Sequence, residues 1–167
     1  MPEGAGKPRQ LLIINYHQDT NRVVAKLLQV RGYRVFSAAT LAEAEQILIA
    51  QQVDLMLCRM TASDGDCAEF IERTFKKHHV PSVAISGSLE TQSRAARLSP
   101  HAVRGILWIP IDTTTMYLAI ATAFSDSPRR IGVCPDCDGK GTIALLTTKC
   151  RCGKCDGNGL ADPTIRD

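Results

Sequence analysis

The 167-residue sequence predicts an α/β protein, a doubly wound five-stranded parallel sheet of the (βα)5 type, followed by a much smaller C-terminal module. The first observation is that short apolar runs alternate with amphipathic helical segments from about residue 10 to residue 124. The second is that these runs are apolar at successive positions, which is typical of strands covered on both faces. The third is that the alternation stops at SDSPRR, residues 125–130, beyond which five of the seven cysteines gather.

The predicted strands have the lengths usual for a buried sheet. They comprise residues 10–15, 33–38, 53–59, 80–86 and 105–109. The first helix follows QLLIIN, and we expect Asp19 or Thr20 as its N-cap and Gly32 directly after its end. Five βα units in succession predict right-handed crossovers, with helices on both faces of the sheet.

The later helices have capping signals of their own. We expect them at residues 41–50, 67–77, 90–98 and 113–124. Thr40 and Glu43 form a T-x-x-E capping box at the start of the second helix. Asp112 is the expected N-cap of the last helix, in which apolar residues recur every fourth position.

The composition is that of a globular protein, with 44% hydrophobic and 22% charged residues. The apolar runs are too short and too interrupted to span a membrane. The first ten residues, MPEGAGKPRQ, do not resemble a secretion signal, so we expect a cytoplasmic location. The net charge of +3 is too small to indicate nucleic-acid binding over the whole chain.

Functional groups of open parallel sheets lie beyond the carboxyl ends of the strands. Here those ends carry Asn15 with Tyr16, Arg59, Ser86, and Ile109 with Pro110. Residues 9–125 resemble the receiver domains of bacterial response regulators, which have the CheY-like fold. The resemblance rests on LLIINYHQDTNRVVAKLLQVRGYRVFSA, VDLMLCRMTASDGDCAEFI, VPSVAISG and GILWIPI, in that order and spacing.

The resemblance implies a phosphorylation site that this sequence lacks. A working receiver has two acidic residues for Mg²⁺, a phosphoacceptor aspartate, a Ser or Thr, and a lysine before a proline. The acidic pair, the aspartate and the lysine are replaced by Asn15, Tyr16, Arg59 and Ile109. Only Ser86 and Pro110 match, and Ile106 stands at the usual aromatic position of the fifth strand. We therefore expect neither Mg²⁺ binding nor phosphorylation.

Four aspartates could in principle replace the missing phosphoacceptor. They are Asp19, Asp54, Asp64 and Asp66. Asp54 begins the third strand and so lies at the wrong end of the sheet, whereas Asp64 and Asp66 lie in the loop after that strand. A true phosphorelay receiver with a displaced aspartate is thus an alternative. Arg59 could also pair with Asp64 or Asp66.

The cysteines beyond residue 130 form an eight-residue repeat. CPDCDGKG, residues 134–141, and CGKCDGNG, residues 152–159, share the pattern C-x-x-C-D-G-x-G. Two C-x-x-C pairs separated by 14 residues are typical of zinc ribbons and knuckles. The predicted ligands of one closed, structural Zn²⁺ are Cys134, Cys137, Cys152 and Cys155. Cys150 is either a surplus thiol or a replacement for Cys152.

The repeat resembles the cysteine-rich zinc region of DnaJ-type chaperones, over about residues 132–160. Those chaperones have four such repeats and this chain has two, so chaperone function does not carry over. Between the pairs, TIALLTT predicts a strand of a small hairpin. We expect a four-cysteine zinc module at 132–160, a linker at 126–131, and a (βα)5 domain at 9–125 with a core separate from that of the module.

The sequence contains no nucleophile–base pair, no phosphate-binding glycine loop and no open metal site, so we expect no enzymatic activity. The predicted function is that of a signalling or adaptor protein of the response-regulator receiver family, which binds a protein partner without being phosphorylated. By resemblance, the partner face comprises the fourth helix, fifth strand and fifth helix, including parts of 89–98 and 112–124. A nucleic-acid-binding transcriptional regulator is the rival prediction. It would use the basic residues Lys140, Lys149, Arg151 and Lys154 of the module.

Overall fold

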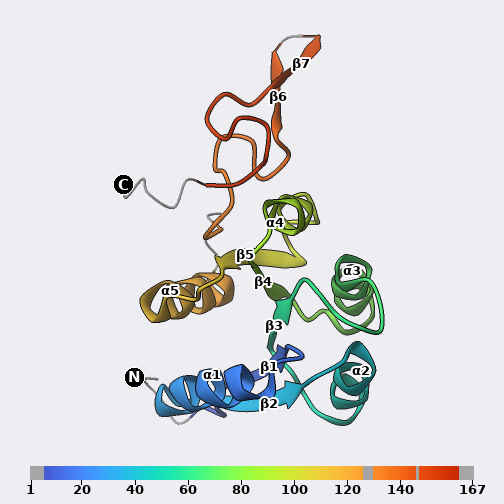
Figure 1. Cartoon of the computed structure of the whole chain (residues 1–167), viewed down its shortest axis with the longest axis vertical. Coiled ribbons are helices and arrows are strands. Elements are labelled where there is room, and N and C mark those ends of the chain that lie inside the picture. The colour runs from blue at the N-terminus through green and yellow to red at the C-terminus, as the bar shows by residue number, and fades with distance from the viewer. Residues whose placement is uncertain (1–5, 126–129, 146, 162–167) are drawn as a thin grey trace. The chain divides into compact units, whose positions relative to one another are not determined.

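The computed structural model describes residues 6–125, 130–145 and 147–161. Five strands form one parallel sheet in the order β2-β1-β3-β4-β5, and two more strands form a separate small sheet (Figure 1). The strands are β1 Gln10–Ile14, β2 Arg34–Ala38, β3 Leu55–Arg59, β4 Ser82–Ser86, β5 Val103–Trp108, β6 Thr142–Leu145 and β7 Thr148–Arg151. The helices are α1 Gln18–Val30, α2 Leu41–Ala50, α3 Cys67–His78, α4 Leu89–Ala96 and α5 Thr113–Phe124. The predicted (βα)5 fold is thereby confirmed.

The chain divides into two compact units, residues 1–82 and 83–167. In the first unit, β1 pairs in parallel with β2 on one side and with β3 on the other. All five residues of β1 are buried, because α1 packs on one side of these strands and α2 and α3 on the other (Figure 1). The continuous apolar run of β1 therefore reflects a strand covered on both faces.

Helix α1 begins earlier than its predicted cap. Its N-cap is His17, so Asp19 lies in the first turn rather than before it. The preceding turn is closed by Asn15, whose side-chain Oδ1 accepts a hydrogen bond from the backbone N–H of His17 at 3.2 Å. An aspartate in the first turn still stabilises the helix, because its charge opposes the helix dipole.

The other N-caps agree with the sequence. Thr40 Oγ1 accepts the backbone N–H of Glu43 at 3.1 Å, which confirms one half of the capping box. The Glu43 carboxylate reaches back one residue further than expected, to the N–H of Ala39 at 2.8 Å. Asp112 Oδ2 accepts the N–H of Thr115 at 2.8 Å and thereby caps α5.

The second unit contains β4, β5, α4 and α5 together with the cysteine module, which we define as residues 130–161. Helices α4 and α5 lie on opposite sides of β5 (Figure 1). The largest fully buried side chains of this unit are Ile106, Leu107 and Met116. The predicted hairpin of the module is present as β6 and β7, which pair antiparallel.

The sequence predicted a cysteine module with a core of its own, joined to the (βα)5 domain by a linker. In the structure, the chain that leads into the module contacts β5. Residues 126–129 of the predicted linker lie outside the described residues, but Arg130 and Ile131 are placed against β5. The backbone N–H of Ile106 donates to the carbonyl of Ile131 at 2.7 Å, and Gly105 and Ile131 form a parallel bridge. The physical reason is that β5 is the last strand of the sheet, so its outer edge has backbone groups that need partners.

Candidate functional sites at the strand ends and in the cysteine module

The last residue of β3 and the residues after β1 bring a guanidinium next to an aromatic ring. The guanidinium carbon of Arg59 lies 5.0 Å from the centre of the Tyr16 ring, a cation–π arrangement. Asn15 is buried, and its carbonyl accepts a hydrogen bond from the side-chain amide of Asn21 at 2.8 Å. These three predicted positions thus hold a guanidinium, an aromatic ring and an amide that serves the local turn.

Asp64 and Asp66, the two aspartates of the β3–α3 loop, act as helix caps. Asp64 accepts the backbone N–H groups of Leu41 and Ala42, at the start of α2, with one carboxylate oxygen each at 3.0 Å. These hydrogen bonds lower the pKa of the Asp64 carboxyl. Asp66 is the N-cap of α3 and accepts the N–H groups of Ala68 and Glu69 at 2.9 and 3.2 Å.

Asp54 and Asp19 also have partners. Asp54 Oδ2 accepts the N–H of Gln10 at 2.7 Å, which ties the beginning of β1 to the chain before β3. Asp19 forms an exposed ion pair with Arg22 at 3.5 Å within α1. Each of the four carboxylates therefore has a local role.

In the second unit, the matching residue Ser86 also serves its own turn. Its hydroxyl donates to the carbonyl of Ser88 at 3.2 Å, accepts the N–H of Ser88 at 3.1 Å, and contacts the hydroxyl of Thr91. Ile109, which the sequence predicts to replace the lysine, is 37% exposed, and its N–H donates to the carbonyl of Ser86 at 3.2 Å. The peptide bond between Ile109 and Pro110 is cis.

The four cysteines predicted as ligands come together. Their sulfur atoms all lie within 4.8 Å of one another, and all four side chains are buried. The sulfur atoms of Cys137 and Cys155 are 3.7 Å apart. A tetrahedral site with metal–sulfur distances of about 2.3 Å has edges of about 3.8 Å, whereas a disulfide requires about 2.05 Å. The arrangement therefore fits a tetrathiolate metal site, and all seven cysteines are free thiols.

The two repeats form equivalent turns around this cluster. The N–H of Gly141 donates to the sulfur of Cys137 at 3.2 Å, and in the second repeat the N–H of Gly159 donates to the sulfur of Cys155 at 3.3 Å. The backbones also interlock: Cys134 N–H donates to the Gly159 carbonyl, and Cys152 N–H donates to the Gly141 carbonyl, at 3.0 and 2.9 Å. Amide donors to thiolates stabilise the charge that metal binding creates.

In each repeat, the aspartate that follows the second cysteine is bound by an arginine that precedes the repeat. Arg130 Nη2 donates to the carbonyl and to Oδ1 of Asp138, at 2.9 and 2.8 Å. Arg151 donates to the carbonyl of Asp156 at 2.8 Å through Nε and pairs with its Oδ1 at 3.1 Å through Nη2. The Arg130 side chain is 1% exposed and that of Arg151 is 70% exposed.

The thiols differ in how readily they lose their protons without a metal. Burial raises the pKa of Cys134 and raises the pKa of Cys137 to about 12, whereas backbone N–H donors, first that of Cys155, lower the pKa of Cys152. A metal bound here would have to displace the proton of Cys137 at neutral pH, because its thiol is neutral there. Its uptake would then release protons and weaken as the pH falls.

Sequence reasoning missed Arg130, the buried arginine. Arg130 lies in the predicted linker at 126–131, where no pattern distinguishes it from Arg129. Its burial arises from tertiary contacts with β5 and with the first cysteine turn. Cys150, which the sequence left open as a ligand, lies opposite Ile143 in the hairpin and outside the four-sulfur cluster.

No family of known sequences matches this chain, and no curated protein matches it either. Solved structures do. A signal receiver domain of an HD domain-containing protein from Pseudomonas fluorescens shares 18% identity and covers 73% of this chain and 90% of its own, with a TM-score of 0.65. A CheY-like response regulator receiver domain protein from Methanospirillum hungatei shares 19%, covers 69% and 92%, and has a TM-score of 0.62.

A third similar structure is the receiver domain of NtrX from Brucella abortus, with 20% identity, coverage of 70% and 99%, and a TM-score of 0.63. These likenesses show that the chain has the receiver, or CheY-like, fold. They extend over nearly the whole length of the solved domains and leave more than a quarter of this chain outside the match. No helix within the described residues is long and apolar enough to cross a membrane.

Proposed function

We propose that this chain is a non-enzymatic, cytoplasmic signalling adaptor, whose receiver-fold domain binds a protein partner without being phosphorylated. The observation that carries the proposal is the engagement of Asp64 and Asp66 at the starts of α2 and α3, together with Arg59 on the Tyr16 ring. The first two are the carboxylates that could most readily have replaced the missing phosphoacceptor, and Arg59 occupies the acceptor position itself.

The chemistry of phosphoryl transfer argues in the same direction. Mg²⁺ binds carboxylate and phosphate oxygens, and a guanidinium at the same place repels the cation. Arginine remains protonated in proteins and cannot accept a phosphoryl group. Asp64 would have to release both amide hydrogen bonds at the start of α2 before it could react.

We also propose that the cysteine module binds one structural Zn²⁺. Its ligands would be Cys134, Cys137, Cys152 and Cys155. Zinc accepts four thiolates in a tetrahedron, and a site filled by four protein ligands leaves no position for a substrate. Fewer than forty residues bury too little apolar surface to fold without such a cross-link. The proposed receiver-like region is 9–125, and the proposed zinc-binding region is 132–160.

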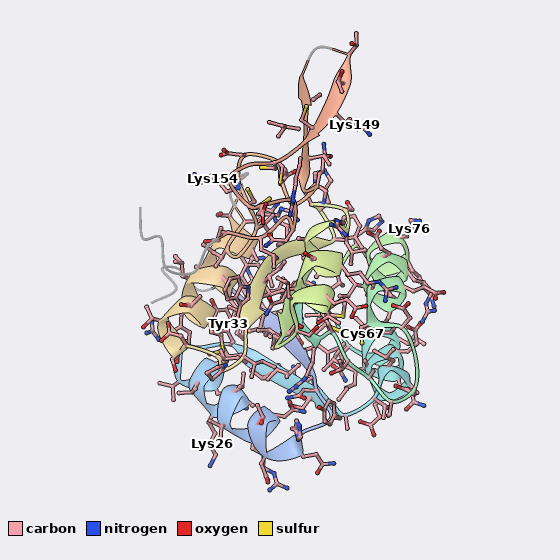
Figure 2. All side chains as sticks on the ribbon, turned by 45° about the horizontal axis from the view of Figure 1, so that its top comes forward. Lys26, Tyr33, Cys67, Lys76, Lys149 and Lys154 are labelled. Atoms are coloured by element: carbon pink, nitrogen blue, oxygen red, sulfur yellow. The ribbon has the colours of Figure 1, made fainter. Side chains whose placement is uncertain are left out.

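The partner contact is proposed on the elements α4, β5 and α5. Leu89 at the start of α4 and Leu118 on α5 are 61% and 53% exposed. A nucleic-acid partner is less well supported, because two of the basic residues of the module are paired: Arg151 with Asp156, and Lys154 with Asp136 at 3.9 Å. Lys149 and Lys154 stand on the surface of the module (Figure 2).

Incubation with acetyl phosphate and Mg²⁺ tests whether the chain can be phosphorylated. We expect no phosphoryl adduct in the intact mass, measured promptly at neutral pH because acyl phosphates hydrolyse. We also expect that Mg²⁺ with beryllofluoride leaves the thermal unfolding midpoint unchanged. A stoichiometric adduct that disappears in Asp64→Asn or in Asp66→Asn would refute the proposal and favour the displaced phosphoacceptor.

A further inference from the structure

The surface formed by α4 and β5 is occupied by the chain's own cysteine module. We define this docking surface as Ser93, Ala96 and Arg97 with β5 residues 103–106. Along β5, the N–H of Ile106 donates to the carbonyl of Ile131 at 2.7 Å. Along α4, the hydroxyl of Ser93 donates to the carbonyl of Asn158, and Arg97 Nη2 donates to the carbonyl of Gly157 at 3.3 Å. The segment before the first repeat thus docks on β5, and the second repeat docks on α4.

Arg130 connects the docking surface to the first cysteine turn. Its Nη1 donates to the carbonyl of Val103 in β5 at 2.9 Å, while Nε and Nη2 bind Asp138. A buried guanidinium is stable only while its hydrogen-bond partners stay in place. Asp138 directly follows Cys137, one of the four clustered cysteines, so the position of this partner depends on the turn that the cluster holds.

Two glycines let the module approach closely. Gly132 has a φ of +79°, and a Cβ there would collide with the carbonyl oxygen of Ile106. Gly139 has a φ of +79° as well, and a Cβ there would collide with the carbonyl oxygen of Ala96 at the end of α4. Backbone lies against backbone at both points, so the fit requires that the turn of the first repeat keep its shape.

We propose that metal occupancy of the cysteine module controls access to the α4–β5 surface. The inference rests on the zinc site of the proposed function and adds a regulatory role to it. With metal bound, the turn holds Asp138 for Arg130 and the module covers the surface. Without metal, the turn loses its cross-link, Arg130 loses its partner, and the module leaves the surface. Because the coupling is reciprocal, docking also tightens metal binding.

The duplicated repeat supplies a matched control. Arg151 makes with Asp156 the same two contacts that Arg130 makes with Asp138, but it is exposed and belongs to the hairpin. Arg130→Ala should therefore detach the module, whereas Arg151→Ala should leave the docking intact. A second matched pair is Gly139→Ala and Gly32→Ala. Both residues have a positive φ, so both substitutions strain the backbone, but the added methyl meets the Ala96 carbonyl at Gly139 and open space at Gly32.

The test is amide hydrogen exchange of the full chain with zinc and after chelation, with zinc content measured in parallel. We expect chelation to speed exchange in β5, at Ile106, and at the end of α4 by about tenfold or more. Zinc-loaded Arg130→Ala should exchange there as the chelated wild type does, and Arg151→Ala as the zinc-loaded wild type does. Should Arg130→Ala fail to fold, Gly139→Ala is compared with Gly32→Ala: faster exchange at Ile106 in the first and not in the second supports the inference.

Two results would overturn the inference and are distinguishable from each other. If zinc is bound and chelation frees only β6 and β7, with Ile106 and α4 exchanging as before, the metal site stands and the control of the surface is wrong. If no zinc binds to the wild type, the proposed metal site fails and the inference fails with it.

Discussion

The carboxyl ends of β1 and β3 and the cysteine module both contain several potential metal ligands, but they arrange them in opposite ways. Near the strands, Asp64 and Asp66 point to the N-termini of two different helices. In the module, four thiols point to one place. A metal site requires several ligand atoms that point to one position, and not merely several suitable residues. The thiols of the module meet this requirement, whereas Asp64 and Asp66 do not.

The largest expected effect is the loss of the four-sulfur site. Serine at Cys134, Cys137, Cys152 or Cys155 should abolish stoichiometric zinc binding and unfold the module, since structural zinc contributes about 10–16 kcal/mol in zinc-finger peptides. Cys150→Ser is the control and should retain one zinc per chain, because Cys150 lies outside the cluster. Zinc content by elemental analysis is the measurement. Loss of zinc in Cys150→Ser, with retention in Cys152→Ser, would show that the ligand set is wrong.

The sequence sufficed for those features that depend on local patterns. The periodicity of apolar residues located all five strands and helices, and Thr40 and Asp112 marked their helix starts correctly. The spacing of the C-x-x-C pairs identified the four cysteines that the structure brings together. Each of these signals lies within a few consecutive residues or in a repeat, and such signals survive in a single sequence.

What the sequence could not supply are contacts between distant segments. Arg130 is buried by β5 and by Asp138, and nothing in SDSPRR indicates either neighbour. In the same way, Asp64 caps α2 although it lies 23 positions beyond Leu41. The α1 cap differs for a local reason: the turn formed by Asn15 and His17, and not the nearest capping residue, fixes where the helix begins.

A smaller effect is expected at Asp66, the N-cap of α3. Asp66→Ala removes the acceptor of the Ala68 and Glu69 amides, so the free energy of unfolding should fall by about 1 kcal/mol, the usual cost of a lost N-cap. Asp19→Ala is the comparison, because it removes a first-turn charge and a largely exposed ion pair with Arg22, and should therefore cost less than the lost cap. Urea denaturation measures both. Equal stabilities of Asp66→Ala and the wild type would return Asp66 to the candidates for a reactive carboxylate.

The smallest effect is expected at Asp64, and it depends on pH. Helix α2 already has Thr40 as its N-cap, so Asp64 adds to a cap that is present without it. The Leu41 and Ala42 amides lower the pKa of the Asp64 carboxyl below its ordinary value of 3.8. A lowered folded-state pKa means that the ionised carboxylate stabilises the fold above the unfolded pKa, and that this contribution is lost as the pH falls through the folded pKa.

Asp64→Asn should therefore be less stable than the wild type at neutral pH, and the difference should shrink as the pH falls below about 4. Urea denaturation at a series of pH values is the measurement, and Asp54→Asn serves as a comparison because that carboxylate also accepts a backbone amide, at the opposite end of the strands. If the difference between Asp64→Asn and the wild type did not change with pH, the carboxylate would not be acting as an ionised helix cap. Its engagement with α2 would then no longer argue against a role in phosphoryl transfer, and the contrast between the strand ends and the cysteine module would weaken at this residue.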